Sequence, residues 1–379
     1  MQALALFLIA VPLVAYLGYP VIIVAASRFA PRRVEVEACA MPAISILICA
    51  HNEAASIAAK LDSVLDAVAA YPATAEIIVG DDGSGDATAA IVETYLPRGV
   101  RLIRAQRGGK AATLARIVAV ATGDVLVMTD ADPLFDAGTL PVLLAPFADP
   151  QVGAVAGSVE TIRGGRLATA DTVFRRYESA LRAAEDRLFG CIAADGGLYA
   201  IRAALMTAIP PDVTDDFYIS TAAVAAGRRI AFAPQAKVYE HSIPGDRQNF
   251  RRRVRITVRG LTGLWRRRAL MNPARTGWYA VALVLHKVAR RLAPLALPPL
   301  WIVSGVLAAG GSVVWAGVFA ALSGAVLLGL VGYCLPVRLP RPLAVAYGAV
   351  LHLAGLGTGV ALFVGGRRYS QWAQQKVGA

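Results

Sequence analysis

The sequence contains few charged residues, few histidines and few cysteines for a chain of 379 residues. Charged residues make up 17% of it and hydrophobic residues 56%, with a mean hydropathy of +0.55, which excludes an ordinary soluble protein. The four cysteines, like the histidines His51, His241 and His286, have no metal-type spacing. The G-x-S-x-G and P-loop patterns are also missing, so the sequence gives no support for serine acyl transfer or a P-loop nucleotide site.

The apolar residues are concentrated at the two ends of the chain. Residues 1–28 contain an uncharged run that is long enough to span a bilayer, and we predict an N-terminal transmembrane helix there. A signal peptide is the alternative, but no Lys or Arg precedes the run, which is also longer than a typical signal core. A membrane region of residues 293–365 is expected at the other end, with spans at about 293–309, 313–333 and 342–364.

The predicted organisation is therefore a central globular domain, residues 40–270, between membrane segments. A basic interface segment, 271–292, leads into the C-terminal spans, and a tail, 366–379, follows them. One span before the domain and three after it would put the charged tail outside the cell, against the positive-inside rule. Either 277–292 adds a span, or 342–364 does not cross fully, or the tail is an exception.

The net charge of +12 lies close to the predicted membrane segments. Arg32 and Arg33 follow the first span, and Arg290 and Arg291 precede the next. Nine more arginines lie between residues 247 and 268. The positive-inside rule predicts that the central domain is cytoplasmic, and we expect the protein in a bacterial plasma (inner) membrane. This distribution favours anionic membrane lipids, and not nucleic acid, as the partner of the basic residues.

The central domain alternates short apolar strands with helical segments. Strands are predicted at 44–50, 76–80, 100–105 and 125–129. The strand at 44–50 has almost no polar residue, which is typical of a sheet covered on both faces. Helices are predicted at 53–70, 87–95, 108–121 and 217–227. This order predicts an α/β domain with a mostly parallel, Rossmann-like sheet.

Two carboxylates, Asp130 and Asp132, follow the strand at 125–129. Ligands bind at this edge of an open α/β sheet, and Mg²⁺ is often held by one or two carboxylates together with substrate phosphates. The pattern predicts a metal–diphosphate site, although Asp-x-Asp also occurs by chance in loops.

Further polar turns follow the other strands. Asp81-Asp82-Gly83-Ser84 could accept hydrogen bonds from a ribose or base, or form an ordinary turn with a helix cap. Gly108-Gly109-Lys110 opens a helix, where backbone amides and the lysine favour a diphosphate. Thr214-Asp215-Asp216 precedes a helix, so an Asp there could be an N-cap or a general base.

The order of these motifs resembles the family 2 glycosyltransferases. The matching segments are ISILICAHNE (44–53), IIVGDDGSGDAT (77–88), GGKAATL (108–114), TDAD (129–132), DGGLYAIR (195–202), TDD (214–216) and QNFRRR (248–253). The chain looks most like the membrane-embedded cellulose, hyaluronan and poly-N-acetylglucosamine synthases. GWYAVALVLHKVARRLAP resembles the interface segment that leads into their C-terminal membrane helices.

The resemblance implies a GT-A fold, a nucleotide-sugar donor, most simply a UDP-sugar, and inversion at the anomeric carbon. It implies that Glu53 and Asp82 hold the uridine and that Lys110 and Asp130 face the donor diphosphate. Mg²⁺ or Mn²⁺ would be bound by Asp132, with Asp130. The resemblance also implies acceptor contacts by Asp195 and Gly196, a further substrate contact by Asp215, and Asp216 as the catalytic base.

Two departures from the family pattern concern the acceptor. The family motif Q-x-x-R-W reads Gln248-Asn249-Phe250-Arg251-Arg252 here, so the substrate-binding motif of Gln248 and Arg251 ends in Arg252 in place of Trp. In polymerising synthases that Trp is associated with the acceptor terminus, and its replacement argues against long-chain synthesis. The number of predicted spans, one before the central domain and three after it, is also small for a polysaccharide channel within one chain.

These observations leave several functions open. The first is transfer of a sugar to a glycan acceptor in polysaccharide or exopolysaccharide synthesis at the membrane, with export or secretion proteins as partners. The second is single-sugar transfer to a lipid acceptor. A non-catalytic scaffold predicts damaged metal or base positions, yet both are intact. A nucleotidyltransferase would leave the TDD triplet and the arginine-rich segment unexplained.

Overall fold

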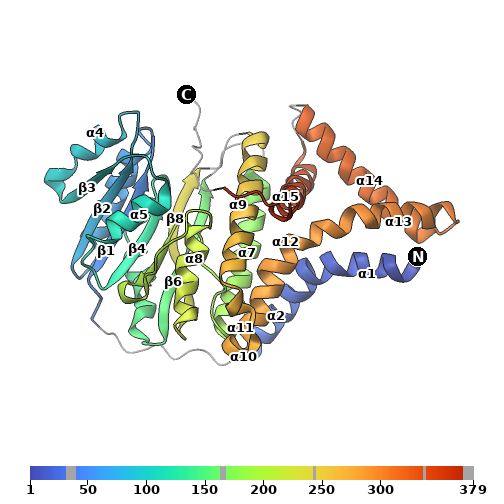
Figure 1. Cartoon of the computed structure of the whole chain (residues 1–379), viewed down its shortest axis with the longest axis horizontal. Helices are drawn as coiled ribbons and strands as arrows, with labels where there is room; N and C mark the ends of the chain where they lie inside the picture. Colours follow the sequence, from blue (N-terminus) through green and yellow to red (C-terminus); the bar gives the residue numbers. More distant parts are fainter. Residues whose placement is uncertain (31–39, 163–167, 242–244, 336–338, 370–379) are drawn as a thin grey trace.

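Among the residues that the structure describes, a single mixed sheet of eight strands forms the centre of the α/β domain (Figure 1). The structure, a computed structural model, describes residues 1–30, 40–162, 168–241, 245–335 and 339–369. In their spatial order the strands are β3 (Val100–Ala105), β2 (Ala75–Asp82), β1 (Ile44–Ala50), β4 (Val125–Asp130), β7 (Tyr199–Arg202), β6 (Val152–Ile162), β8 (Arg229–His241) and β5 (Leu134–Phe135). The sheet is parallel from β3 to β4, and β7 is antiparallel to both of its neighbours.

Helices cover both faces of this sheet. Because successive side chains of a strand point to opposite faces, Ile46 and Ile48 of β1 pack on one side and Leu47 and Cys49 on the other. The first side is covered by α3 (Ile57–Ala69), α4 (Thr88–Glu93) and α6 (Thr139–Leu144), and the second by α5 (Lys110–Val118) and α8 (Asp215–Ala225). The predicted α/β architecture with a mostly parallel sheet is confirmed.

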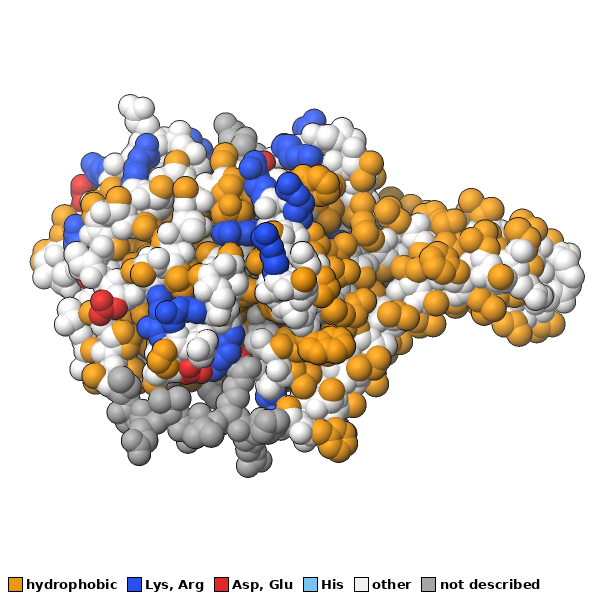
Figure 2. All heavy atoms as spheres, turned by 60° about the horizontal axis from the view of Figure 1, so that its bottom comes forward, with side chains coloured by type: hydrophobic (Ala, Val, Ile, Leu, Met, Phe, Trp, Pro, Cys, Tyr) orange, Lys and Arg blue, Asp and Glu red, His pale blue; other side chains and the backbone are white. Residues whose placement is uncertain are grey.

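Two long helices, α7 (Ala168–Leu188) and α9 (Asp246–Arg266), stand between the sheet and a projecting group of apolar helices (Figure 1). The apolar group consists of α1 (Gln2–Leu13), α2 (Tyr19–Phe29), α10 (Pro273–Thr276), α11 (Trp278–Leu283), α12 (Arg290–Leu292), α13 (Leu297–Ala309), α14 (Val313–Cys334) and α15 (Arg341–Val364). Its outer part carries almost only hydrophobic side chains, while Lys and Arg gather where it joins the catalytic domain (Figure 2).

Among the described residues, four runs of helix are long and apolar enough to cross a membrane: Gln2–Phe29, Trp278–Ala309, Val313–Cys334 and Arg341–Val364. Large exposed hydrophobic side chains such as Val313 (85% exposed) indicate membrane association, because water would disfavour so large an apolar surface. The predicted interface segment 271–292 and the predicted span 293–309 are not separated in the structure, since helix continues from Trp278 to Ala309.

The last apolar helix does not stand apart from the catalytic domain. α15 packs along α9 and also touches α7, with Tyr347 donating a hydrogen bond of 2.7 Å to Asp246 at the start of α9. This arrangement suits the prediction that 342–364 does not cross fully, but the side of the membrane stays a prediction. Arg32, Arg33, Lys376 and the tail from residue 370 onward lie outside the described residues.

Candidate active site

Some of the predicted site residues meet at one edge of the sheet because they lie at or after the ends of neighbouring parallel strands. In the register of the sheet, Ala50 lies opposite Asp81, and Cys49 lies opposite Asp130. The ends of β1, β2 and β4 therefore lie side by side, which brings Glu53, Asp82 and the Asp130 motif together. The start of β7 reaches the same edge from the other direction, since Tyr199 pairs with Met128.

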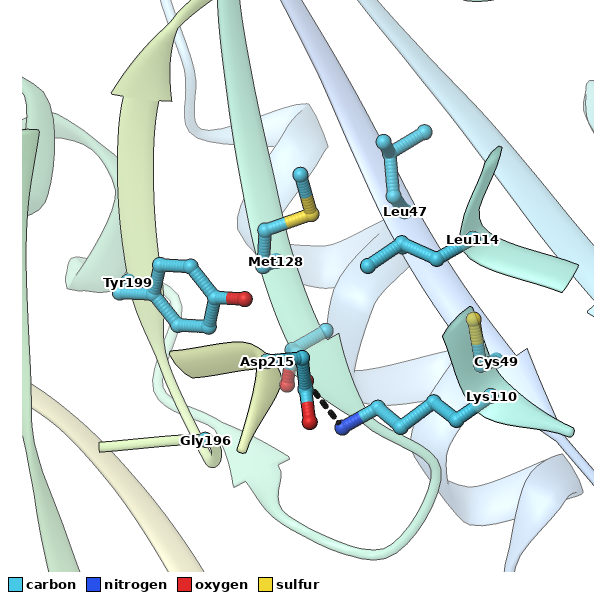
Figure 3. A pocket seen from close by; sticks show the side chains of 9 residues that line it. Leu47, Cys49, Lys110, Leu114, Met128, Gly196, Tyr199 and Asp215 are labelled. Atoms are coloured by element: carbon cyan, nitrogen blue, oxygen red, sulfur yellow. Dashed lines mark ion pairs between the residues drawn. The ribbon is translucent and has the colours of Figure 1, made fainter. Parts of the chain in front are cut away.

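Lys110 connects two of the motifs. Its ammonium group lies 2.6 Å from Asp130 Oδ1. It also lies 2.7 Å from Asp215 Oδ2, and Figure 3 draws this second ion pair. Burial alone would lower the pKa of Lys110, but the charges of Asp130 and Asp215 outweigh it and raise the pKa well above its usual value. The same ion pair outweighs burial at Asp215 and lowers the pKa of that carboxyl group. Lys110 therefore stays charged and joins the two carboxylate loops.

A small cavity lies directly beneath this ion pair. Its volume is about 10 Å³, and Tyr199, Met128 and Leu114 line it together with Lys110 (Figure 3). The buried hydroxyl group of Tyr199 has no hydrogen-bond partner among the described residues. The cavity is about the size of one water molecule and is too small for a sugar.

Asp130 and Asp132 are suited to a divalent cation. Asp132 is exposed at the sheet edge, where desolvation by its surroundings and the charge of Asp130 raise the pKa of its carboxyl group. A cation would relieve this repulsion. Within the described part of the chain, no group of three His, Cys, Asp or Glu residues could hold a metal alone, so the remaining ligands would be diphosphate oxygens and water.

Glu53 lies on the same side of the site as the metal motif. Burial, together with the charges of Asp132 and Asp130, raises the pKa of Glu53 to about 7, although a hydrogen bond of 3.0 Å from Ser56 opposes the shift. The residue is half-buried and its backbone amide donates to Thr88. Its predicted contact with the uridine stays a prediction, and its position at the sheet edge is compatible with it.

Asp82 supports the glycine-rich turn. Its fully buried carboxylate accepts hydrogen bonds from the Gly108 amide at 2.8 Å, the Gly109 amide at 3.0 Å and the Thr113 hydroxyl at 2.9 Å. The expectation that these two amides face the donor diphosphate is therefore not met, because Asp82 already occupies them. The predicted contact of Asp82 with uridine remains a prediction.

Asp216 faces Gly196, the residue after Asp195. A methyl group at Gly196 would lie 3.4 Å from Asp130 Oδ2 and 3.9 Å from Asp216 Oδ2, so this glycine lies between the metal motif and the predicted base. Burial and the neighbouring charge of Asp215 raise the pKa of Asp216 to about 6. A carboxylate with such a pKa can accept a proton near neutral pH.

Asp195 has a fixed charge. Its carboxylate lies 2.6 Å from the guanidinium group of Arg182, a buried residue of α7. Burial would raise the pKa of Asp195, but the ion pair with Arg182 outweighs it and holds the pKa at about 2. Asp195 is therefore ionised and suited to accept hydrogen bonds from hydroxyl groups.

The predicted acceptor motif lies in the first turns of α9. Gln248 and Arg252 are half-buried and Arg251 is exposed. The pKa of Asp132 is raised by burial and by the charge of Asp130, and the charge of Arg252 opposes this rise. The side chain that replaces the family's Trp is thus electrostatically coupled to the metal motif.

Lys60 is a residue that the sequence did not single out. It is fully buried on α3, donates a hydrogen bond of 2.7 Å to Thr129 and another to the carbonyl group of Pro133, and lies over the Phe135 ring. Burial lowers its pKa to about 7, against the charges of Asp132 and Asp130. Lys60 holds the loop that carries both aspartates. The one signal in the sequence was its position on the apolar face of the helix, between Ile57 and Leu61.

We predict that Gly196→Ala reduces sugar transfer by about 10²-fold without unfolding the protein. The added methyl group makes ordinary contacts but occupies the space between Asp130 and Asp216. Transfer rate and thermal midpoint should be measured beside Gly138→Ala, where no atom lies within 4 Å of the new methyl group. Normal transfer by Gly196→Ala would show that no substrate passes between the two carboxylates.

The raised pKa of Asp216 predicts a pH dependence of activity. The base works only when deprotonated, so kcat/KM should be highest well above pH 6 and fall about tenfold for each further unit of pH below the pKa of about 6. Initial rates at low substrate concentrations, between about pH 5 and pH 8, test this. A profile that stays flat on the acid side would contradict the assignment of Asp216.

Fold and site together define an α/β domain of the GT-A type, joined to helices that are apolar enough for membrane association. Comparisons with known proteins agree. Residues 45–200 match the Glycosyl transferase family 2. The mannosyltransferase PcManGT from Pyrobaculum calidifontis, solved with GDP-Man and Mn²⁺, is 25% identical and superposes with a TM-score of 0.70 over 94% of this chain and 98% of its own.

Two curated relatives are N-acetylglucosaminyltransferases. The protein of Rhizobium meliloti (strain 1021) is 26% identical over 224 residues, which cover 54% of this chain and 52% of the relative. That of Rhizobium leguminosarum bv. trifolii is 26% identical over 128 residues, 33% of this chain and 70% of the relative. The chain spans about half the length of the first relative, so the relative's activity is not carried over directly. The match to the family model thus covers residues 45–200, and the likeness to PcManGT extends over a GT-A fold.

Proposed function

We propose that this protein is an inverting glycosyltransferase that moves a sugar from a nucleotide-diphosphate sugar to an acceptor at the membrane. The observation that carries the proposal is the convergence of Asp130 and Asp216 on Gly196. Asp130, a predicted metal ligand, and Asp216, whose pKa is raised, lie on either side of the space next to Gly196. A single displacement needs a leaving group and a base at one place, and these two carboxylates would serve them.

The roles of the chain's own residues follow from their surroundings. Asp216 would take the proton of the attacking acceptor hydroxyl group, while Asp195, ionised by its pair with Arg182, orients the acceptor sugar. Lys110 keeps the loops of Asp130 and Asp215 at a fixed separation. Inversion requires one displacement at the anomeric carbon, so no enzyme nucleophile is needed.

The residues at the sheet edge fit Mg²⁺ or Mn²⁺. Asp132 is open to such an ion, and Asp130 keeps Oδ2 on the side of Gly196 while Oδ1 contacts Lys110. When bound there, the ion supplies positive charge that stabilises the leaving diphosphate. PcManGT, solved with GDP-Man and Mn²⁺, supports a nucleotide-sugar donor together with a divalent cation.

The acceptor is proposed in two forms. Transfer to a glycan in polysaccharide or exopolysaccharide synthesis is supported by the resemblance to polysaccharide synthases and by the two N-acetylglucosaminyltransferase relatives. Single-sugar transfer to a lipid is favoured by a specific observation, the replacement of the family's Trp by Arg252 beside the metal motif. A cytoplasmic catalytic domain at the inner membrane, with export proteins as partners, belongs to the same proposal.

A donor screen tests this function. Purified full-length protein in detergent would receive UDP- and GDP-sugars with Mg²⁺ or Mn²⁺, and release of the nucleoside diphosphate would be measured. We expect one donor to be consumed well above the others, and membrane extract as the source of acceptor to accelerate its consumption. If none of the donors is consumed with either cation, the proposed function is wrong.

A further inference from the structure

The hydroxyl group of Tyr199 borders the cavity beside the Lys110–Asp215 ion pair. Tyr199 belongs to β7 and is only 1% exposed. In Figure 3 its hydroxyl group points from the strand toward Asp215, into a space of about 10 Å³ that Lys110 and Gly196 also line. Because Gly196 also faces Asp216, the cavity and the predicted base border the same glycine.

The Tyr199 hydroxyl group is a buried donor that lacks a protein acceptor. None of the described residues is its hydrogen-bond partner. A buried hydroxyl group without a partner costs free energy, so native proteins usually supply one, either from the chain or as ordered water. Burial raises the pKa of Tyr199 well above its usual value, and the charges of Asp215, Asp216 and Asp130 act in the same direction. The hydroxyl group therefore keeps its proton and can donate it in a hydrogen bond.

The other polar groups of the cavity are suited to the same partner. An ammonium group has three N–H donors, and two of those of Lys110 are directed at Asp130 and Asp215. The third is left to donate, and the Asp215 carboxylate can accept more than one hydrogen bond. The cavity has the volume of one water molecule, and its polar groups provide the two to four partners that a buried water needs. The remaining walls are mostly apolar and include Leu47, Leu114 and Met128.

The ion pair at this cavity determines the electrostatic surroundings of the predicted base. Asp215 directly precedes Asp216 at the start of α8. Burial raises the pKa of Asp216, the charge of Asp215 raises it further, and the charge of Lys110 opposes both. A group that holds Asp215 and Lys110 in place therefore also influences how Asp216 works.

We propose that the cavity binds one ordered water molecule, that this water connects Tyr199 to the Lys110–Asp215 ion pair, and that Tyr199 is thereby a positioning residue for Asp216. Tyr199 and Lys110 donate hydrogen bonds to the water, and the water donates one to the Asp215 carboxylate. The role of Asp216 rests on the proposed transferase function, whereas the water site does not depend on it.

Thermal unfolding of Tyr199→Phe in the full-length protein tests the water site without any measurement of activity. Phe keeps the ring and removes only the hydroxyl group. If that group binds the water, its loss removes hydrogen bonds, and we expect the thermal midpoint to fall by about 2–4 °C. If the hydroxyl group is buried without any partner, its removal relieves that cost and the midpoint rises. An unchanged or higher midpoint overturns the water site.

Tyr71→Phe is the matched control for this substitution. Tyr71 is also buried, but its hydroxyl group donates a hydrogen bond of 2.6 Å to the carbonyl group of Pro42, far from the predicted site. Its loss should lower the midpoint in the same way. In a crystal structure of the wild type that resolves buried water, a water molecule should lie within hydrogen-bond distance of Tyr199, Lys110 and Asp215. Apolar contacts alone in that space would contradict the proposal.

A double-mutant cycle tests the positioning role. Transfer is measured for the wild type, Tyr199→Phe, Asp215→Asn and the double variant, with the donor that the wild type consumes. We expect Tyr199→Phe to lower kcat about tenfold with both KM values unchanged, because its buried side chain reaches neither substrate. In the Asp215→Asn background the same change should have little further effect, since Tyr199 acts through Asp215. Tyr71→Phe should leave kcat unchanged in both backgrounds.

The outcomes of these experiments are distinguishable. An unchanged kcat in Tyr199→Phe, or an equal loss with and without the Asp215 carboxylate, overturns the positioning role. A raised KM with kcat unchanged would place Tyr199 in substrate binding and overturns it as well. If the wild type transfers no sugar, the proposed function itself fails, while the thermal midpoints and the crystal structure still decide whether the water site exists.

Discussion

Asp216→Asn should bind the nucleotide sugar normally and lose sugar transfer by roughly 10²–10⁴-fold, the usual contribution of a general base. Asn keeps the shape of the side chain and can still accept the hydrogen bond of 2.8 Å that the Phe217 amide donates to Asp216 Oδ1. It cannot accept a proton from the acceptor. Donor affinity and transfer rate, measured on the same preparation, separate these two effects.

Asp215→Asn is the matched control, because it removes a neighbouring carboxylate with a different partner. Asp215 contacts Lys110 at 2.7 Å, whereas Asp216 faces Gly196, so the two side chains serve different purposes. We expect Asp215→Asn to weaken transfer less than Asp216→Asn does. If Asp215→Asn is the inactive variant while Asp216→Asn transfers sugar freely, the base is Asp215 and the assignment is wrong.

Asp132→Ala should lower the rate of metal-dependent sugar transfer by at least about 10²-fold, because the leaving diphosphate loses charge stabilisation worth several kcal/mol. The protein should remain folded, since the Asp132 side chain is exposed and contributes little to the core. Removal of divalent cations from the wild type with EDTA should have the same effect, and added Mn²⁺ or Mg²⁺ should restore the wild type only.

Asp124→Ala provides the control for this substitution. Asp124 is also exposed and lies directly before Val125, the first residue of β4. Asp124→Ala therefore removes one negative charge, as Asp132→Ala does, but at the end of the strand away from the predicted site. It should transfer sugar at the normal rate. Full activity of the wild type in EDTA, or of Asp132→Ala with added cation, is incompatible with the metal assignment.

Local patterns in the sequence were sufficient to predict the catalytic half of the sheet. The strand expected at 44–50 coincides with β1, which is buried between two layers of helices and is apolar along its length. The strand expected at 100–105 coincides with β3, an edge strand that carries Arg101 and Arg104. The strand at 76–80 was predicted too short, since β2 continues to Asp82 and includes both aspartates of the turn. Polar residues at a strand end resemble a loop in sequence although they still pair in the sheet.

Contacts between distant segments could not be predicted in this way. The partner of Lys110 at Asp215 is 105 residues away (215 − 110), and nothing local marks the pair. The same is true of the hydrogen bonds that Asp82 accepts from the amides of Gly108 and Gly109, which no local pattern marks. Such pairings depend on which loops the strand order brings together, and that order emerges only from the packed sheet.

The stereochemistry of transfer tests the central claim most directly. Purified full-length protein would be given the donor it consumes, with an α anomeric bond, together with a membrane acceptor and Mn²⁺, and the configuration of the new glycosidic bond would be determined by NMR. A single displacement assisted by Asp216 predicts a β-linked product in the wild type and none of it in Asp216→Asn. An α-linked product would contradict the proposed mechanism, because retention requires a second displacement or an internal return that this account does not contain.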